Sequence, residues 1–347
     1  MKSPPDRRKA EWSAPVIRSV ADSNGPSTRG PTPQRFEFYH DLQCRSGLGD
    51  RLLDLWAAAT IARLHDSEAR LGVRWEPGLE HQGRVSHYAS ELFSIAQIGF
   101  VAEPPVGAMP VRKEFSHTER NEQGIIHLAS DTRQILLRGG MIWGTNCPDQ
   151  LHAELAFYQL DPSVPLACVI DTYRGVARDT APAAIIAEAL PHDLARRTGF
   201  HVRRGDKLVA EETAIDMSVA TWGAIEQAGH LAIERCIESG EPIFLCSDDR
   251  AYREALLRDI RQKGGDVVTA PARPAHRRLP GYSALVDFFC LAGCAQIVQM
   301  TKHSTFSLAA ALLGDRPLVN FYRAEIGVGI GSRLDIWRSA VRRLSRG

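Results

Sequence analysis

Apolar positions in the second half of this chain follow two alternating patterns. Short apolar runs predict strands, and longer segments in which apolar residues recur every three or four positions predict helices. The predicted strands cover residues 199–202, 242–246, 267–269, 296–300 and 317–321, and the predicted helices cover residues 218–237, 251–262, 283–293 and 304–313. Because strands and helices alternate, we expect a parallel sheet with helices on both faces.

The first half opens with the same pattern. Phe36, Phe38 and Tyr39 predict a short strand, a glycine-rich turn follows, and residues 52–64 have the spacing of a helix. Residues 71–150 predict irregular loops and short strands, because glycine and proline interrupt the apolar pattern there.

Two further elements are expected before the second half. Residues 166–170 predict a buried strand, and residues 181–190 predict a helix that Pro182 opens near its first turn. Since each half begins with a strand and a polar turn, the chain predicts an α/β fold of two Rossmann-like domains that face each other across a cleft. We place these domains at residues 35–190 and 191–325.

The two ends of the chain differ from its middle. Residues 1–34 hold six of the 20 prolines and few apolar residues, which predicts a disordered tail. Residues 326–347 predict a basic amphipathic helix that packs on a domain, and peripheral contact of the basic termini with a membrane is the alternative. The apolar stripe of this helix consists of Leu334, Trp337, Val341 and Leu344.

Charge is almost balanced over the 347 residues, with 42 Lys and Arg against 41 Asp and Glu. This balance argues against nucleic-acid binding through a general basic surface but allows a local arginine cluster aimed at a phosphate. No apolar run reaches the length of about 18 residues that a membrane span needs, and we expect no secretory signal. The seven cysteines form no CxxC pairs, so we expect reduced thiols, a cytoplasmic protein and no metal site.

The densest polar cluster is the heptapeptide from His201 to Lys207, His-Val-Arg-Arg-Gly-Asp-Lys, which begins in a predicted strand and continues into its loop. Ligands of open α/β sheets bind at the carboxyl ends of strands, and the guanidinium fork suits a phosphate. Neighbouring residues of a strand point to opposite faces, so we expect only one of Arg203 and Arg204 to meet a ligand. The other would fix the loop with Asp206, and a purely structural Arg–Asp bridge is the alternative.

The turn Gly47-Leu48-Gly49-Asp50 lies between a predicted strand and a predicted helix. It suits close backbone approach to a ligand and anion binding at a helix N-terminus. A tight turn in which Asp50 caps the helix is the alternative. The third glycine of a dinucleotide fingerprint and the lysine of a P-loop are missing.

Ser247, Asp248 and Asp249 close another predicted strand. Two carboxylates at such a place can bind a divalent metal, but the two aspartates are contiguous and Arg250 lies beside them. Helix capping or contact with a ribose is therefore favoured.

Ser304, Thr305 and Phe306 open the predicted helix at 304–313. Hydroxyl groups and free backbone N–H groups there can cap the helix, bind an anion, or do both. Asp287 lies inside an apolar stretch, and a buried charge needs a partner. It is either a paired structural carboxylate or an acceptor for the base or ribose of a ligand.

Taken in order, these motifs resemble those of the GDP-fucose-dependent fucosyltransferases, which include the α-1,6 enzymes, the α-1,2 enzymes and the protein O-fucosyltransferases. The heptapeptide from His201 is similar to their HxRRxDK-type peptide, and the sequence from Phe244 to Asp249 is similar to their strand ending in (S/T)DD. Residues 287–306 resemble the third motif, and the Gly47–Asp50 turn resembles the GxGN or GxGD turn of this superfamily.

The resemblance implies a GT-B fold, with the nucleotide sugar held by the second domain, the acceptor facing it from the first, and no metal or other cofactor. Arg203 would hold the β-phosphate of the donor and stabilise the departing GDP. Glu211, ten residues after His201, would be the base that deprotonates the acceptor hydroxyl in an inverting transfer. Donor-binding positions implied by the motifs are His201, Arg203, Arg204, Asp206, Lys207, Asp248, Asp287, Ser304, Thr305, Phe306, Gly47, Gly49 and Asp50.

The segment from Lys302 to Ser307 is closer to the α-1,2 and protein-modifying branches than to the α-1,6 branch, so the acceptor, a glycan or a protein, stays open. Two other functions also stay open at this point. One is a non-catalytic module that binds a nucleotide or glycan on the same scaffold, and the other is a transferase that uses another nucleotide sugar.

Overall fold

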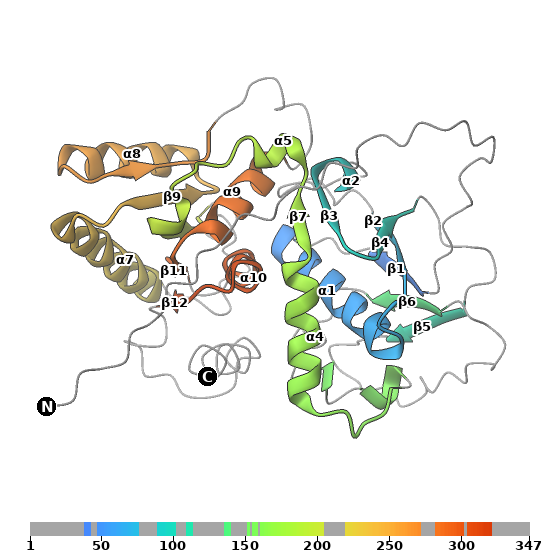
Figure 1. The fold of residues 1–347 in the computed structure, drawn as a ribbon. Coiled ribbons are helices and arrows are strands. Elements are labelled where there is room, and N and C mark those ends of the chain that lie inside the picture. The colour runs from blue at the N-terminus through green and yellow to red at the C-terminus, as the bar shows by residue number, and fades with distance from the viewer. Residues whose placement is uncertain are drawn as a thin grey trace, which may run out of the picture. The chain divides into compact units, whose positions relative to one another are not determined.

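The computed structural model describes residues 38–42, 47–75, 89–101, 109–113, 135–139, 151–152, 155–158, 160–204, 219–271, 282–301 and 304–320. Within these ranges the chain is a mixed α/β protein with two five-stranded parallel sheets and one small antiparallel pair of strands (Figure 1). The predicted tail, the predicted C-terminal helix, Asp206, Lys207 and Glu211 lie outside the described residues, and the domain boundary near residue 190 stays a prediction.

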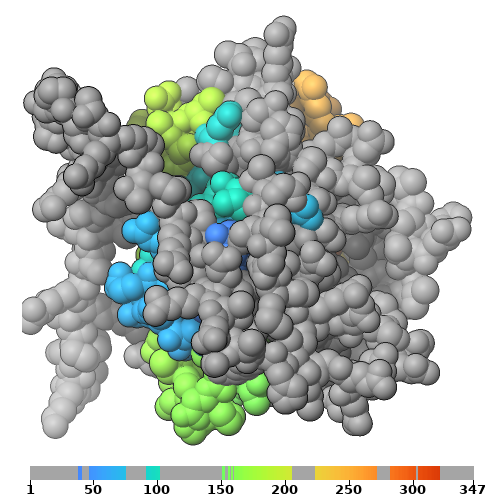
Figure 2. All heavy atoms as spheres, turned by 90° about the vertical axis from the view of Figure 1, so that its right-hand side faces the viewer, coloured from blue at the N-terminus to red at the C-terminus, as the bar shows by residue number. Residues whose placement is uncertain are grey.

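The first sheet has the order β4-β2-β1-β6-β5, with every pair of neighbours parallel. Its strands are β1 (Phe38–Leu42), β2 (Leu71–Trp75), β4 (Ile98–Phe100), β5 (Met109–Lys113) and β6 (Ile135–Gly139). The helix α1 (Leu48–His65) follows β1 and is buried along most of its length. On the face shown in Figure 2, most of the described atoms that reach the surface belong to the first half of the chain, coloured blue to green.

The second sheet has the order β10-β9-β8-β11-β12, again parallel throughout. Its strands are β8 (Thr198–Val202), β9 (Ile243–Ser247), β10 (Val267–Val268), β11 (Gln296–Gln299) and β12 (Leu318–Asn320). The helices that alternate with them are α7 (Val219–Ser239), α8 (Arg250–Gln262), α9 (Tyr282–Gly293) and α10 (Thr305–Gly314). The elements predicted for this half are therefore confirmed, with bounds that differ by one or two residues.

The two faces of the second sheet are covered by different helices (Figure 1). Phe200, Val202 and Leu245 pack in one cluster with residues of α7 and α8. Phe244 and Cys246 point to the other face, where they pack with residues of α9 and α10. Because successive side chains of a strand alternate between faces, this division explains why β8 and β9 are buried at every position.

The prediction of a strand at residues 166–170 is wrong. These residues form the first turn and more of α4 (Leu166–Arg178). The apolar run is short enough to suit either structure, but Val169, Tyr173 and Val176 are all fully buried at helical spacing. The apolar face of α4 continues beyond the run, and this continuation is what makes it a helix.

The predicted helix at residues 181–190 is only partly correct. Its beginning belongs to β7 (Thr180–Pro182), which pairs antiparallel with β3 (Phe93–Ile95), and only α5 (Ala184–Ala187) is helical. The remaining short helices are α2 (Ala89–Leu92), η1 (Leu155–Tyr158) and η2 (Leu194–Arg196).

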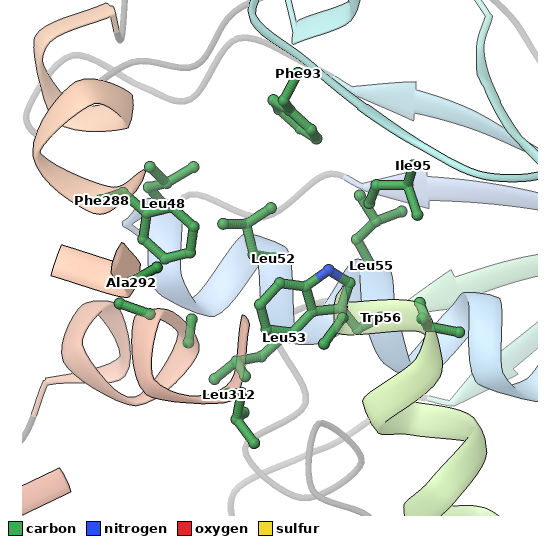
Figure 3. Packing of buried hydrophobic residues seen from close by; sticks show 14 of the residues in the cluster. Leu48, Leu52, Leu53, Leu55, Trp56, Phe93, Ile95, Phe288, Ala292 and Leu312 are labelled. Atoms are coloured by element: carbon green, nitrogen blue, oxygen red, sulfur yellow. The ribbon is translucent and has the colours of Figure 1, made fainter. Parts of the chain in front are cut away.

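The helices α1, α4 and α10 contact one another and share one apolar core. Trp56 of α1 is fully buried, and its Nε1 donates to Oγ1 of Thr180 at 2.9 Å. The hydroxyl of Tyr173 in α4 donates to the carbonyl of Leu53 at 3.0 Å. Figure 3 shows α1 side chains among those of β3, α9 and α10, with labels on Leu48, Leu52, Leu53, Leu55, Trp56, Phe93, Ile95, Phe288, Ala292 and Leu312. This core fixes the N-terminus of α1 near that of α10.

Candidate functional site

The carboxyl ends of three neighbouring strands carry the polar motifs of the second half. β8 lies in the middle of the sheet, with β9 and β10 on one side and β11 and β12 on the other. His201 pairs with Cys246 of β9 and with Gln299 of β11, so the three strands end together. Strand order reverses at β8, and ligands of open α/β sheets bind outside the strand ends at such a reversal. The sheet therefore places the candidate site beyond His201.

His201 is buried against the beginning of α10. Its Nδ1 lies 2.6 Å from Oγ of Ser307 and 3.3 Å from Oγ of Ser304, and its ring centroid lies 5.0 Å from that of Phe306. Burial, together with the charge of Arg203, lowers the pKa of His201 to about 3. The imidazole is therefore neutral at neutral pH, and it acts in the site as a hydrogen-bonding group without a charge.

Ser304 is the N-cap of α10, as one of its predicted roles required. Its backbone is extended, and its Oγ accepts a hydrogen bond from the backbone nitrogen of Ser307 at 3.3 Å. Capping satisfies one of the free N–H groups at this helix end and leaves others near Thr305 and Phe306. The N-terminus of α10 carries a partial positive charge directly beside His201.

The glycine-rich turn approaches α10 closely. A Cβ atom on Gly49 would lie 2.6 Å from Cα of Phe306 and closer still to backbone atoms of Thr305 and Phe306, so only glycine fits there. The close backbone approach predicted for this turn is therefore made to another helix. It brings the N-termini of α1 and α10 together, and two such termini favour a bound anion more than one does.

Asp50 does not cap α1, which was the alternative role considered for it. The helix α1 already begins at Leu48, and its N-cap is Gly47, which has no side chain to offer. Asp50 lies in the first turn, where a carboxylate interacts favourably with the helix dipole.

The two aspartates after β9 have separate contacts. Oδ1 of Asp248 accepts a hydrogen bond from the backbone nitrogen of Arg204 at 2.7 Å, which ties the end of β8 to the end of β9. Asp249 is the N-cap of α8, and its Oδ1 accepts from the backbone nitrogen of Tyr252 at 3.0 Å. The capping role favoured for this motif is confirmed for Asp249.

The arginine pair is divided between two environments. The guanidinium of Arg204 forms ion pairs with Glu226 and, at 3.6 Å, with Asp249. Arg203 is half-buried, and its positive charge contributes to the lowered pKa of His201. The ion pair of the arginine cluster is therefore made with residues of α7 and α8, whereas Asp206, the partner expected from the sequence, lies outside the described residues.

Asp287 lies in α9 with its carboxylate buried. Burial raises the pKa of Asp287 to about 7, and the charge of Arg253 opposes this shift. Its Oδ1 has no hydrogen-bond partner among the described residues. Of the two roles considered for Asp287, the one that needs an unused acceptor atom agrees with this observation.

Three further residues belong to the surroundings of the site and were not identified from the sequence. Ser307 contacts His201, and Glu226 and Tyr252 surround Arg204. Ser307 follows the Ser304–Phe306 motif directly, and its helical position facing the strand end is the signal that could have identified it. Glu226 and Tyr252 lie within helices and belong to no motif, so only the tertiary structure brings them to the site.

Over the ranges that the structure describes, no three His, Cys, Asp or Glu residues are grouped so that they could hold a metal ion. The described cysteines, namely Cys168, Cys236, Cys246, Cys290 and Cys294, are free thiols. None of the described helices combines the length and the apolar character that crossing a membrane requires.

No protein-family model matches this chain, and neither does any curated protein sequence. Solved structures do match. The NodZ α-1,6-fucosyltransferase soaked with GDP-fucose is 18% identical, with 84% of this chain and 96% of that chain covered and a TM-score of 0.49. The fucosyltransferase NodZ from Bradyrhizobium is 18% identical, with 83% and 96% covered and a TM-score of 0.48.

Two other similar structures contain GDP. POFUT1 in complex with GDP is 11% identical, with 81% of this chain and 96% of that chain covered and a TM-score of 0.43. Arabidopsis thaliana FUT1, as a variant in complex with GDP, is 14% identical, with 87% and 72% covered and a TM-score of 0.44. The two NodZ structures among these matches are named as fucosyltransferases.

Proposed function

We propose that this protein is a glycosyltransferase that moves fucose from GDP-fucose to a hydroxyl group of a glycan or protein, with inversion and without a metal. One observation carries the proposal. His201 lies near the end of the central strand of the second sheet, beside the place where the N-termini of α1 and α10 meet, and Arg203 follows two residues later. Fixed positive charge and free N–H groups at the reversal of strand order suit a diphosphate. The two sheets would be the cores of two Rossmann-like domains in a GT-B arrangement.

In the proposed reaction, the acceptor oxygen forms a bond to the anomeric carbon as the bond from that carbon to the β-phosphate oxygen breaks. Glu211 receives the proton of the acceptor hydroxyl. Negative charge grows on the departing GDP, and Arg203 stabilises it together with the N–H groups at the start of α10. A guanidinium keeps its charge at any working pH, so this stabilisation needs no metal and no other cofactor. A single displacement inverts the configuration at the anomeric carbon.

His201, which is neutral, and Asp287 would both contribute to recognition of the sugar donor. The contact with Ser307 fixes the His201 imidazole, which then offers its remaining ring nitrogen to the donor. Oδ1 of Asp287 is an acceptor without a partner among the described residues. Guanine has N–H groups that can donate a hydrogen bond to such an oxygen. A buried acceptor without a hydrogen bond costs free energy. A guanine nucleotide would remove this cost.

The acceptor would bind on the side of the first domain, and the reaction would take place in the cytoplasm. Free thiols at the five described cysteines agree with a reducing compartment.

Turnover of GDP-fucose by the Arg203→Ala variant tests this proposal. We expect kcat/KM for GDP-fucose, measured by the release of GDP, to fall by about 10²–10³-fold. This is the usual effect of removing one hydrogen-bond donor that stabilises charge developing in the transition state. Arg258→Ala is the matched control, because Arg258 is an exposed arginine of α8, and it should stay within about twofold of the wild type.

Activity of Arg203→Ala within a few-fold of the wild type would overturn the assignment. Tight GDP binding by the wild type without turnover on any acceptor would instead identify a non-catalytic nucleotide-binding module. Turnover of another nucleotide sugar in preference to GDP-fucose would replace the donor and leave the reaction class in place.

A further inference from the structure

Arg204 is surrounded by groups from α7, from α8 and from the end of β9. Its guanidinium forms ion pairs with Glu226 of α7 and Asp249 at the start of α8. Its Cζ lies 4.1 Å from the ring centroid of Tyr252, an arrangement that attracts a cation to the face of an aromatic ring. Its backbone nitrogen donates to Asp248. Both ends of this residue are therefore held by the protein itself.

Further contacts fix Glu226 and Tyr252, the two residues of α7 and α8 that contact the Arg204 side chain. Burial raises the pKa of Tyr252, and the nearby carboxylate of Glu226 raises it further. Nε2 of His230 lies 2.9 Å from the hydroxyl of Tyr252. Glu226 and His230 are one turn apart in α7, so α7 and α8 are joined through Tyr252. We call Glu226, Tyr252 and His230 the Arg204 clamp.

The clamp lies on the opposite face of the sheet from His201. Val202 packs in the core beneath α7 and α8, and Arg204, two residues later, forms its ion pairs with these same helices. His201 contacts α10 on the other face, and Arg203 acts on His201. Alternation along an extended chain explains this separation. Holding Arg204 on one face therefore directs Arg203 to the face of the N-termini of α1 and α10.

We infer that Glu226 and Tyr252 are positioning residues, which hold Arg204 so that Arg203 is presented to the diphosphate of the donor. Arg204 then acts through the chain and not as a ligand of the nucleotide. This inference rests on the proposed function and adds to it residues that no sequence motif contains. Preorganisation of a charged group costs no rearrangement at the moment of reaction, and for that reason a clamp remote from the substrate changes the rate.

The test compares Glu226→Gln with Glu234→Gln. Both glutamates lie in α7 and pair with a cation, but Glu234 pairs with Lys263 at 3.4 Å on the surface. We expect Glu226→Gln and Tyr252→Phe each to lower kcat for GDP-fucose turnover by about tenfold with KM for the donor within about twofold, because the interaction lost acts mainly in the transition state. Glu234→Gln should leave both constants within about twofold.

A double-mutant cycle shows whether Glu226 acts through Arg204. We expect Arg204→Ala combined with Glu226→Gln to be no slower than Arg204→Ala alone, because the two residues then act as one unit. Multiplicative effects, a Glu226→Gln variant that behaves like Glu234→Gln, or an Arg204→Ala variant that changes only KM for the donor would each overturn the clamp and leave the proposed function in place. A wild-type protein that does not turn over GDP-fucose would overturn the proposed function and this inference with it.

Discussion

Nδ1 of His201 and Oγ of Ser307 lie 2.6 Å apart, and this buried contact joins the central strand of the second sheet to the helix α10. Ser307 is fully buried and His201 nearly so. Charging this imidazole would place an ion in a buried position, so burial keeps its pKa low. The contact therefore fixes a neutral ring at the strand end from which the candidate site extends.

Two buried groups near the site should affect stability with opposite dependence on pH. The pKa of His201 is lowered from 6.5 to about 3, so between these values the unfolded state binds more protons, and stability is lost as pH falls. The pKa of Asp287 is raised from 3.8 to about 7. Between these two values the native state binds more protons than the unfolded state, so stability is lost as pH rises. Between about pH 4 and 6.5 the two dependences on pH are equal and opposite, so together they leave the stability of the wild type constant.

The Asp287→Asn variant should reveal the His201 contribution. Without the opposing group, its free energy of unfolding relative to the wild type should fall as pH is lowered from 6.5 to 4.5, by about 1.4 kcal/mol per pH unit at most. Urea unfolding at several pH values measures this difference. A difference between the two proteins that stays constant over this range would contradict the burial described for Asp287.

Replacing Gly49 with alanine should disturb the meeting of the two helix N-termini. The added methyl group would overlap backbone atoms of Thr305 and Phe306, so we expect a loss of about 1–3 kcal/mol in the free energy of unfolding, with weaker GDP binding.

The control is Gly223→Ala, at an exposed position in α7 where a Cβ atom meets nothing within 4 Å. It should stabilise the protein by about 0.5–1 kcal/mol, because alanine is the better helix former. Equal effects of the two substitutions in urea unfolding would show that α1 does not approach α10 as described.

The described cysteines should differ sharply in reactivity. Cys168 is exposed, whereas Cys236, Cys246 and Cys294 are buried. Burial raises the pKa of Cys294 to about 12 and the pKa of Cys246 well above its usual value, so little thiolate forms at pH 8. Iodoacetamide labelling of the native protein, read by peptide mass spectrometry, should modify Cys168 first. Labelling of Cys246 at the rate of Cys168 would contradict its burial, and all should react alike in urea.

Most of the second sheet could be predicted from the sequence because its strands hold short apolar runs, such as residues 243–246, and the helices between them have apolar residues at helical spacing. β8 and β9 are buried at every position, which removes the ambiguity of an alternating pattern. The first half gave weaker signals. The apolar run at residues 166–170 suited a strand as well as a helix, and only the continued spacing through Tyr173 and Val176 identifies α4.

The grouping of the site depends on contacts that no local pattern contains. Gly49 and Phe306 are far apart in the sequence, and each motif alone predicts only a helix start. The tertiary structure shows that the two helix starts meet. Likewise, alternation along the extended chain that continues from β8 predicts that Arg203 and Arg204 separate. Only the positions of α7 and α8 show that Arg204 lies against Glu226 and Tyr252.

Isothermal titration with GDP and with UDP tests the central claim most directly, since it measures whether this chain binds the nucleotide of the proposed donor. We predict that GDP binds at least tenfold more tightly than UDP and that Arg203→Ala weakens GDP binding, while Arg258→Ala does not. At a free GDP concentration 100 times the dissociation constant, binding should also raise the free energy of unfolding by about 2.7 kcal/mol. Equal or tighter binding of UDP, or no binding of either nucleotide, would contradict the account.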